Sequence, residues 1–332
     1  MHQPVRKLPS VVFGTLLVCL LAAAPALAGN GGLAPVTPNS PNASAITDSY
    51  WFITGFVLLV FVCVEGLLIA FVVKYRRKKR AREAEGPQIH GSSRLETMWT
   101  AIPVLILVAI ATFVFVKLPG IKNVPSASAA AGRLDVRVVG QQFSWQFTYP
   151  NGAVAVDRLR IPVGQPVKLI VTAPDFDVIH SWWIPALGGK IDAIPGRVNH
   201  TWFTATEAGV FTGRCAELCG VQHAVMTMTV EAMPRAEFDR WVTGRVRQQT
   251  SGTAGSSLGE ETWTGACAKC HGLSGGGIVG PPIAQSGTLQ DEAALTRLLR
   301  NGTGSMPPVG RDWQQNQIDA LSAYVKERFG SQ

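Results

Sequence analysis

Two long apolar runs in the first third of this 332-residue chain constrain its fold more than any other feature. Residues 51–73 and 99–118 are each long enough to cross the hydrocarbon core of a membrane as a helix. A basic run, residues 74–80, follows the first span at once, and basic segments beside spans stay on the cytoplasmic side. The sequence therefore predicts a transmembrane helical hairpin over residues 49–119, with both chain ends on the extracytoplasmic side.

The same basic run accounts for most of the formal net charge of +8. Basic runs also bind nucleic acid, but the position of this one beside a span is explained by membrane topology. We therefore expect no nucleic-acid partner. A hydrophobic content of 47% with only 16% charged residues agrees with a chain that lies partly in lipid.

The N-terminus has the features of an export signal. Arg6 and Lys7 precede an apolar run, and Ala28 ends a small-residue cleavage site. This pattern predicts a signal peptide over residues 1–28. Residues 29–48 would then form an extracytoplasmic N-terminal tail, which we expect to be extended as far as residue 42 because it is rich in Gly, Pro, Asn and Ser.

Beyond the second span, residues 120–245 have the pattern of a β domain. Short β-type runs alternate with turn signals such as Asn151-Gly152. The runs predicted as strands are residues 134–139, 143–149, 158–161, 167–172, 197–204 and 224–231. They predict an all-β antiparallel sandwich or barrel, whose end loops are rigid hosts for a ligand-binding site.

One loop of this domain gathers metal-binding side chains, because Cys215 and Cys219 are followed by His223 and Met226. Thiolate and thioether ligands together favour copper over oxygen-preferring ions and over structural zinc. Two thiolates suit a pair of copper ions bridged by both sulfurs, and such a centre needs a second imidazole. His180, in an apolar segment upstream, is the candidate. The alternative interpretation is a surface disulfide or a zinc loop.

The C-terminal part carries a second candidate redox site. The Gly-, Ser- and Thr-rich residues 246–258 predict a flexible linker before a domain over residues 259–332. Cys267-Ala268-Lys269-Cys270-His271 is a C-x-x-C-H sequence, which is typical of covalent haem c attachment, with a redox dithiol as the alternative. Met306, in a Gly- and Pro-rich loop, is the candidate sixth ligand of the haem iron.

The order and spacing of the candidate ligands resemble the binuclear copper (CuA) centre of subunit II of the haem-copper cytochrome c oxidases. Residues 187–197 and 95–103 resemble other segments of that family, and the likeness spans residues 45–240. The resemblance implies a cupredoxin-like fold for residues 120–245. It also implies that the two cysteines bridge the coppers, that His180 and Met226 bind one copper, and that His223 and the backbone carbonyl of Glu217 bind the other.

Three further roles follow from the same resemblance. The Glu217 side chain would reach a magnesium or manganese ion at the border with subunit I. Glu96 would lie at a proton-uptake entrance, whereas without the family it is a helix-start carboxylate favoured by the helix dipole. Phe143 stands where the family has the Trp at which electrons enter. This departure bears on where a soluble cytochrome c docks.

Residues 259–332 resemble class I cytochrome c, an all-α fold. The resemblance implies thioether bonds from Cys267 and Cys270, with His271 and Met306 as axial ligands of the haem iron. The loop Gly280-Pro281-Pro282 would buttress His271. An amphipathic closing helix is predicted over residues 313–329. A unit of this size can bury only a small apolar core of its own, so covalent haem would supply the missing apolar mass.

These features together predict the subunit at which electrons enter a proton-pumping cytochrome c oxidase of a bacterial inner membrane. Electrons would pass from the tethered haem c to CuA and on to the haem-copper centres of subunit I, where O2 is reduced to water, so no catalytic residue is expected on this chain. The expected partners are subunits I and III and an external donor such as a cytochrome or a bc1-type complex. The alternatives are the equivalent subunit of a CuA-containing nitric oxide reductase and a membrane-anchored electron carrier without an oxidase.

Overall fold

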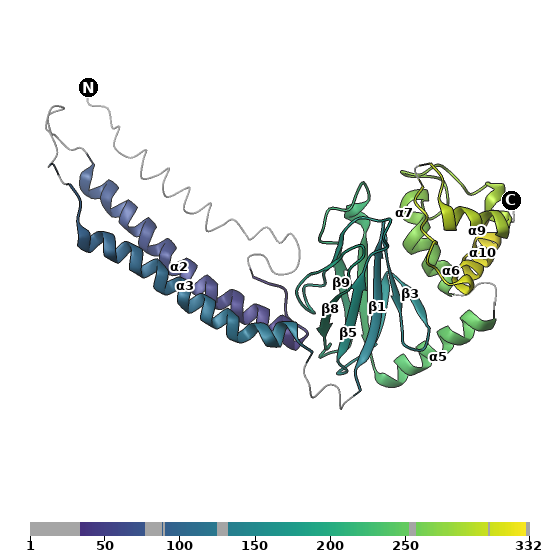
Figure 1. The fold of residues 1–332 in the computed structure, drawn as a ribbon, viewed down its shortest axis with the longest axis horizontal. Helices are drawn as coiled ribbons and strands as arrows, with labels where there is room; N and C mark the ends of the chain where they lie inside the picture. The colour runs from purple at the N-terminus through teal and green to yellow at the C-terminus, as the bar shows by residue number, and fades with distance from the viewer. Residues whose placement is uncertain are drawn as a thin grey trace, which may run out of the picture.

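The computed structural model describes residues 34–76, 88, 90–124, 132–251, 257–304 and 306–329. Figure 1 shows three bodies in a row: a pair of long helices, a β domain, and a group of shorter helices at the C-terminal end. The predicted signal peptide, residues 1–28, lies outside the described residues, and so does most of the basic loop after the first span.

Two antiparallel helices, α2 (Pro41–Tyr75) and α3 (Ser93–Lys122), form the hairpin. Within the described residues these are the helices long and apolar enough to cross a membrane, and they contain the predicted spans. Their apolar side chains are largely exposed, apart from contacts between the helices such as the stacked rings of Phe52 and Phe113, whose centroids lie 4.0 Å apart. Such a surface needs lipid or another protein to cover it. The prediction of two spans is confirmed.

The start of α2 is anchored on the β domain. The N–H of Asn39 donates to the carbonyl of Ala186 at 2.7 Å, and the side-chain amide of Asn42 donates to the carbonyl of Trp202 at 2.5 Å. Pro41 stands in the first turn, where its fixed φ suits a helix and its missing N–H is not needed. The expectation of an extended tail through residue 42 is therefore wrong at its end, because the helix begins at Pro41.

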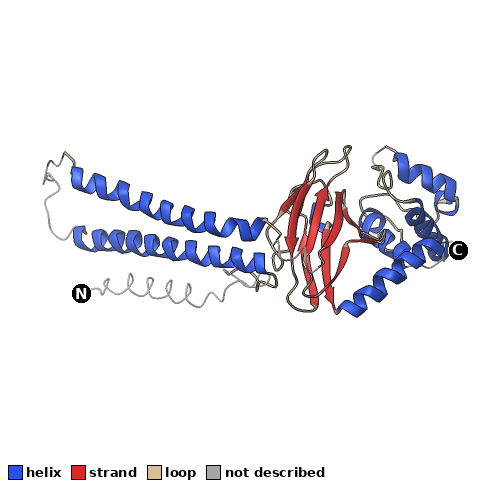
Figure 2. Cartoon of the chain, turned by 60° about the horizontal axis from the view of Figure 1, so that its bottom comes forward, coloured by secondary structure: helices blue, strands red, loops and turns tan. Residues whose placement is uncertain are grey.

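The β domain is built from two facing sheets and a small strand pair (Figure 2). The larger sheet has the order β3-β2-β1-β5-β8, the smaller one has the order β4-β10-β9, and β6 pairs with β7. The strands are β1 (Leu134–Gln141), β2 (Ser144–Thr148), β3 (Val154–Val156), β4 (Arg158–Pro162), β5 (Val167–Thr172), β6 (His180–Trp182), β7 (Ile191–Ala193), β8 (Asn199–Phe203), β9 (Gly209–Arg214) and β10 (Thr227–Met233).

The sheets are mixed rather than antiparallel throughout. β1 pairs in parallel with β5, and β4 pairs in parallel with β10. The prediction of an antiparallel sandwich is wrong for these two pairs. Parallel neighbours are joined by long crossovers, whereas turn signals in a sequence report only hairpins. The all-β, cupredoxin-like sandwich itself is confirmed.

The core of the β domain reaches into the cysteine-containing loop. Along β5, Val167, Leu169 and Val171 are fully buried while the residues between them are not, as expected for a strand with one face on the core. The same continuous cluster of buried side chains includes Cys215, Cys219 and Met226. The predicted ligand loop therefore sits at one end of the sandwich core rather than on a mobile surface turn.

Helix α5 (Arg235–Ser251) leads from the β domain towards the C-terminal end. It runs through residues 246–251, so the prediction of a flexible linker is wrong for this part, and residues 252–256 lie outside the described residues. Gln249 explains the difference: its side chain accepts from the N–H of Val154 at 2.9 Å and donates to the carbonyl of Gly152 at 3.1 Å. These bonds hold the last turns of the helix against β3.

The described residues from 257 to 329 form the C-terminal module, which is all-α as predicted. Its elements are α6 (Ser257–Thr262), the π-helix η2 (Trp263–Cys267), α7 (Ala268–His271), α8 (Gly287–Gln290), α9 (Glu292–Asn301) and α10 (Gln315–Phe329). Leu295 and Leu299 of α9 pack with Ile318 and Leu321 of α10 and with Trp263. Figures 1 and 2 both place this module on the side of the β domain opposite the hairpin.

Candidate copper and haem sites

The cysteine-containing loop closes the hairpin between β9 and β10. Arg214 is opposite Thr227 in the antiparallel register, and the N–H of Cys215 donates to the carbonyl of Met226 at 2.9 Å. The first and last candidate ligands therefore lie side by side at the neck of the loop. The N–H of Ala216 also donates to the carbonyl of Ser181 at 2.9 Å, which ties the loop to the strand that carries His180.

Four candidate ligands of this loop are in contact. The Sγ of Cys219 lies 3.8 Å from the Sγ of Cys215, 3.7 Å from the Sδ of Met226 and 3.5 Å from Nδ1 of His223. The backbone carbonyl of Glu217 accepts from the Sγ of Cys215 at 3.2 Å. The short 3₁₀-helix η1 (His223–Val225) supplies the turn that brings His223 back to the sulfurs.

His180 completes the cluster from a different strand. It begins β6 and is fully buried, and its ring lies within a ligand cluster whose donor atoms, with those of Cys215 and Cys219, are all within 4.8 Å of one another. Oδ2 of Asp177 is 3.4 Å from Nε2, yet among the described residues neither ring nitrogen has a hydrogen-bond partner. A buried imidazole without partners is costly unless it binds a ligand.

The donor set fits copper. The distance of 3.8 Å between the two thiol sulfurs far exceeds the ~2.05 Å of a disulfide bond, so the geometry does not support the disulfide interpretation. A thioether beside two thiols and two imidazoles suits a soft metal and is unusual for structural zinc. The residues present therefore match a copper centre in both chemistry and proximity.

The two thiols are also electrostatically coupled. Their mutual contact lowers the pKa of Cys215 and raises the pKa of Cys219. Because the thiolate is the form that binds metal, the thiol protons must be released when metal binds, and Cys215 releases its proton more readily than Cys219.

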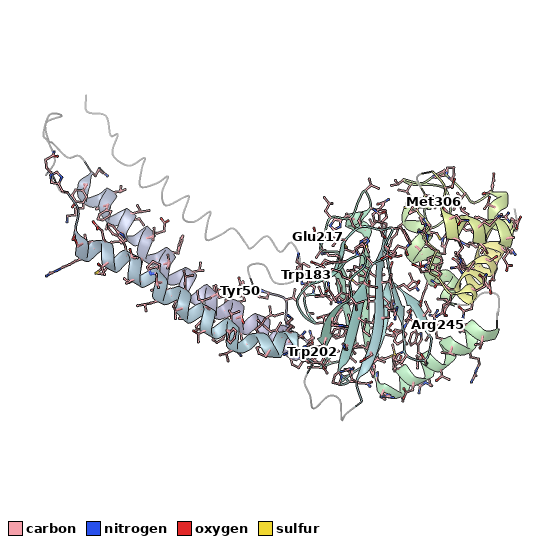
Figure 3. All side chains as sticks on the ribbon, in the orientation of Figure 1. Tyr50, Trp183, Trp202, Glu217, Arg245 and Met306 are labelled. Atoms are coloured by element: carbon pink, nitrogen blue, oxygen red, sulfur yellow. The ribbon has the colours of Figure 1, made fainter. Side chains whose placement is uncertain are left out.

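The two predicted carboxylate sites lie far apart. The Glu217 side chain is half exposed with Lys190 4.0 Å away, and Figure 3 shows it on the side of the β domain nearer the hairpin. Glu96 lies in the first turn of α3, at the end of that helix away from the β domain, where its Oε1 accepts from the N–H of Ser92 at 3.3 Å. The structure does not bring Glu96 near any other predicted site residue.

A cavity of about 760 Å³ occupies the C-terminal module, a volume typical of ligand sites. Its walls are mainly apolar side chains of the module, including Leu295, Leu299 and Val325. The predicted haem residues all line it: Cys267, Cys270, His271 and Met306. The cavity therefore matches a covalently bound haem in size, polarity and available ligands.

The loop predicted to buttress His271 does so. Nδ1 of His271 lies 2.8 Å from the carbonyl oxygen of Pro281, which fixes the ring and leaves Nε2 as the nitrogen free to bind metal. A Cβ on Gly280 would lie 2.8 Å from Cε1 of this ring, so only glycine fits there. Met306 is held by paired backbone bonds with Thr303, at 2.8 and 3.0 Å.

The β domain supplies part of the same cavity wall, which the sequence did not predict. Gln142, Phe143, Gly220 and Val221 line the cavity beside the residues of the module. Phe143, predicted only as the place where electrons enter, thus faces the haem cavity. No local sequence signal identifies the other three, because their role depends on how the module docks.

Two membrane-spanning helices, a cupredoxin-like domain with a sulfur-rich loop and a module of cytochrome c type define a membrane-bound electron-transfer subunit. Residues 32–116 match the family described as "Cytochrome C oxidase subunit II, transmembrane domain", and residues 152–233 match "Cytochrome C oxidase subunit II, periplasmic domain". Residues 256–325 match "Cytochrome C oxidase, cbb3-type, subunit III".

Similar proteins cover most of the chain. The cytochrome c oxidase subunit 2 of Alkalihalophilus pseudofirmus is 34% identical over 323 residues, which are 90% of this chain and 91% of that protein. The cytochrome c oxidase subunit 2 of Bacillus sp. (strain PS3) is 32% identical over 60% of this chain and 59% of its own length. The solved periplasmic domain of subunit II of cytochrome oxidase of Bradyrhizobium japonicum is 34% identical, with a TM-score of 0.33, over 35% of this chain and 94% of that structure.

The chain belongs to the cytochrome c oxidase subunit II family. It is a subunit of a haem-copper oxidase with a role in electron transfer, and it associates with a subunit I. The family implies a CuA copper centre, and the C-terminal module implies haem. Two spans and an extracytoplasmic domain make it a membrane protein.

Proposed function

We propose that this chain is the subunit at which electrons enter a proton-pumping cytochrome c oxidase, passing from a tethered haem c to CuA and on to the haem-copper centres of subunit I, where O2 is reduced to water. The shared wall of the two candidate sites carries this proposal. Gln142 lines the cavity of the C-terminal module, and its side-chain amide donates to the carbonyl of Cys219 at 2.6 Å. One residue thus touches both sites.

In this proposal Cys215 and Cys219 would both be ligands of a copper pair, which would supply one-electron transfer. His180 and Met226 complete one ligand set, and His223 with the Glu217 carbonyl completes the other. The contribution of the chain is to hold these donors at the neck of a hairpin and in a buried strand. A site that is already close to its bound geometry needs little reorganisation.

The haem would be held by thioether bonds to Cys267 and Cys270, with His271 and Met306 as axial ligands. A Met ligand raises the reduction potential of a haem, which suits an electron carrier. The bond between His271 and Pro281 would orient the imidazole, and the apolar wall would exclude water.

The remaining assignments concern the partners. Glu217, half exposed on the side of the β domain nearer the hairpin, would reach a magnesium or manganese ion at the border with subunit I. Glu96 would lie at the cytoplasmic entrance of a proton path. Both termini would lie on the periplasmic side of a bacterial inner membrane, with subunit III as a further partner. The external donor would be a cytochrome or a bc1-type complex.

Oxygen consumption and nitric oxide reduction by the purified complex test this function. We expect oxygen consumption with a reduced donor, together with optical absorbance of haem c and the EPR signal of mixed-valence copper. Activity with nitric oxide alone would instead identify a CuA-containing nitric oxide reductase. Isolation under mild detergent without any haem-copper subunit would identify a membrane-anchored electron carrier.

A further inference from the structure

A lysine of the C-x-x-C-H sequence is buried against the β domain. The Nζ of Lys269 donates to the carbonyl of Phe143 at 2.7 Å and forms an ion pair with the carboxylate of Asp157. Only 12% of the Lys269 side chain and 20% of the Asp157 side chain is exposed. The haem-attachment segment is therefore itself a contact between the module and the β domain.

Asp157 is fixed by hydrogen bonds within the β domain. It forms the turn between β3 and β4 with a positive φ of 56°, and its Oδ1 accepts from the N–H of Trp145 at 2.8 Å. Its backbone N–H donates to the carbonyl of Trp145, and its own carbonyl accepts from Thr229. The carboxylate is thus a rigid part of the β domain, and its second oxygen is left to receive Lys269.

A second ion contact has the opposite polarity. Oε1 of Glu261, in α6, lies 3.0 Å from a guanidinium nitrogen of Arg160 and 2.8 Å from one of Arg245. Both guanidinium groups also lie over the ring of Trp241, at 4.9 and 5.6 Å from its centroid. Arg245 is almost fully buried on α5, and Figure 3 shows it where α5 passes beneath the module.

The two contacts together specify an orientation. At one the module supplies the cation and the β domain the anion, and at the other the signs are exchanged. Rotating the module so that the contacts trade places would bring like charges together, which strongly disfavours that arrangement. Between them, Gly265 lies so close to β3 that a Cβ there would be 2.5 Å from Val156.

In this orientation the cavity of the module opens on the cysteine-containing loop, residues 215–226, which is called the copper loop from here on. Gln142 and Phe143 line the cavity, and Gln142 donates to the carbonyl of the copper-loop residue Cys219. The side-chain amide of Gln222, in the same loop, donates to the carbonyl of Lys269 at 2.9 Å. The copper loop and the haem-attachment segment are therefore joined directly by a hydrogen bond.

We propose that Lys269 with Asp157 and Glu261 with Arg160 and Arg245 form an interdomain clamp, which holds the C-terminal module docked with its cavity against the copper loop. Lys269 and Glu261 are positioning residues, because they set where the module docks and do not bind either cofactor. Only the consequence of the clamp, which is rapid electron transfer between the two sites, rests on the proposed function. The docking itself is a property of the chain.

Lys269→Met, Glu261→Gln and the combined variant test the clamp in the full complex. The matched control is Lys326→Met, which removes a more exposed ion pair within the module, between Lys326 and Glu292 at 3.3 Å. Lys269→Arg retains the cation and serves as the rescue variant. Glu261→Gln lies outside the haem-attachment sequence, so it remains informative if Lys269→Met lowers haem content.

The first measurement is amide hydrogen exchange in residues 140–146 and 263–271, with α9 as the internal reference. Removing one partner of a partly buried ion pair is expected to raise exchange at the interface about tenfold to a hundredfold, with α9 unchanged. The second is the rate of electron transfer after photoreduction of haem c, expected to fall about tenfold while both reduction potentials stay the same. Lys269→Arg should restore most of the protection from exchange and most of the electron-transfer rate. Lys326→Met should change neither the exchange nor the rate.

Unchanged interface exchange and unchanged transfer rates in both single variants would overturn the clamp. Faster exchange in α9 as well would also overturn it, since that result means the module has lost stability rather than its docked position. Failure of the proposed function looks different. In that case the unsubstituted complex lacks the haem c or copper spectrum, or the copper stays oxidised after photoreduction, while the exchange experiment still reports docking.

Discussion

The copper loop and the haem cavity bind their cofactors with opposite strategies. In the loop, two thiols, a thioether and an imidazole are already in contact at 3.5–3.8 Å, and all the candidate side chains lie on or beside strands of a packed sandwich. In the module, the haem residues surround about 760 Å³ of space and come from separate short helices and loops. The first site is organised by the protein, whereas we expect the second to need its cofactor as part of the core.

This difference follows from the amount of core available to each domain. The β domain buries a continuous apolar cluster from Leu134 to Phe238. The module has a much smaller cluster around Trp263 and the helices α9 and α10. A small unit with a large apolar cavity is marginally stable alone, because the wall of an empty cavity loses its packing contacts.

The largest effect is expected from Cys267→Ser combined with Cys270→Ser. Without covalent haem the module should lose most or all of its stability, about 5 kcal/mol or more, whereas the β domain should unfold at its usual temperature. Scanning calorimetry of the purified chain measures both transitions. Cys63→Ser, on the exposed surface of α2, is the control. A module transition that survives unchanged would mean that haem is not part of its core.

Cys219→Ser should abolish copper binding and leave the fold. Cys219 touches three other candidate ligands, so its loss removes the centre of the cluster, but the β9–β10 hairpin keeps its own pairing. We expect no copper EPR signal and a destabilisation of about 1–3 kcal/mol. Elemental analysis and denaturant unfolding provide the two readouts. Retained stoichiometric copper would contradict the assignment of Cys219.

A smaller effect is expected from Met226→Leu. The two side chains have similar volumes, so this buried substitution should cost less than ~1.5 kcal/mol, but it removes the thioether. The copper reduction potential and spectrum should change while copper remains bound. Met228→Leu is the matched control, because Met228 is equally buried in β10 and its substitution should leave the spectrum unchanged. Identical copper properties in both variants would exclude Met226 as a ligand.

The smallest effect is expected from Phe143→Trp. In the full chain the module covers this residue, so the substitution should change little. In a chain that ends after Ser251, at the end of α5, Trp should speed the oxidation of a soluble reduced cytochrome c. Stopped-flow absorbance compares the two truncated proteins. Equal rates would show that electrons do not enter at this position.

The clustering of the side chains in the copper loop could be predicted because their spacing is local in the sequence. The four candidate ligands lie in one short stretch of sequence: Cys215, Cys219, His223 and Met226. A motif this short can be identified from the sequence alone. His180 comes from another strand, and only the need for a second imidazole and the family resemblance pointed to it. The parallel strand pairs were missed because crossovers leave no turn signal.

The contacts between domains could not be predicted from the sequence. Nothing near Gln249 indicates that α5 continues to Ser251, since the bonds that hold it are made by β3, nearly 100 residues earlier. Lys269 is an unremarkable residue inside the C-x-x-C-H sequence until the fold places it against Asp157. Such pairings depend on tertiary packing, which overrides local composition.

Transient absorbance of the complex after photoreduction of haem c, recorded at several protein concentrations, tests whether haem c reduces the copper centre of the same chain. We expect the c-type band to reoxidise as the copper band bleaches, with one rate constant that does not depend on concentration, because donor and acceptor sites share a wall on one chain. A rate that rises in proportion to protein concentration, or a c-type band that reoxidises without bleaching of the copper band, would contradict it.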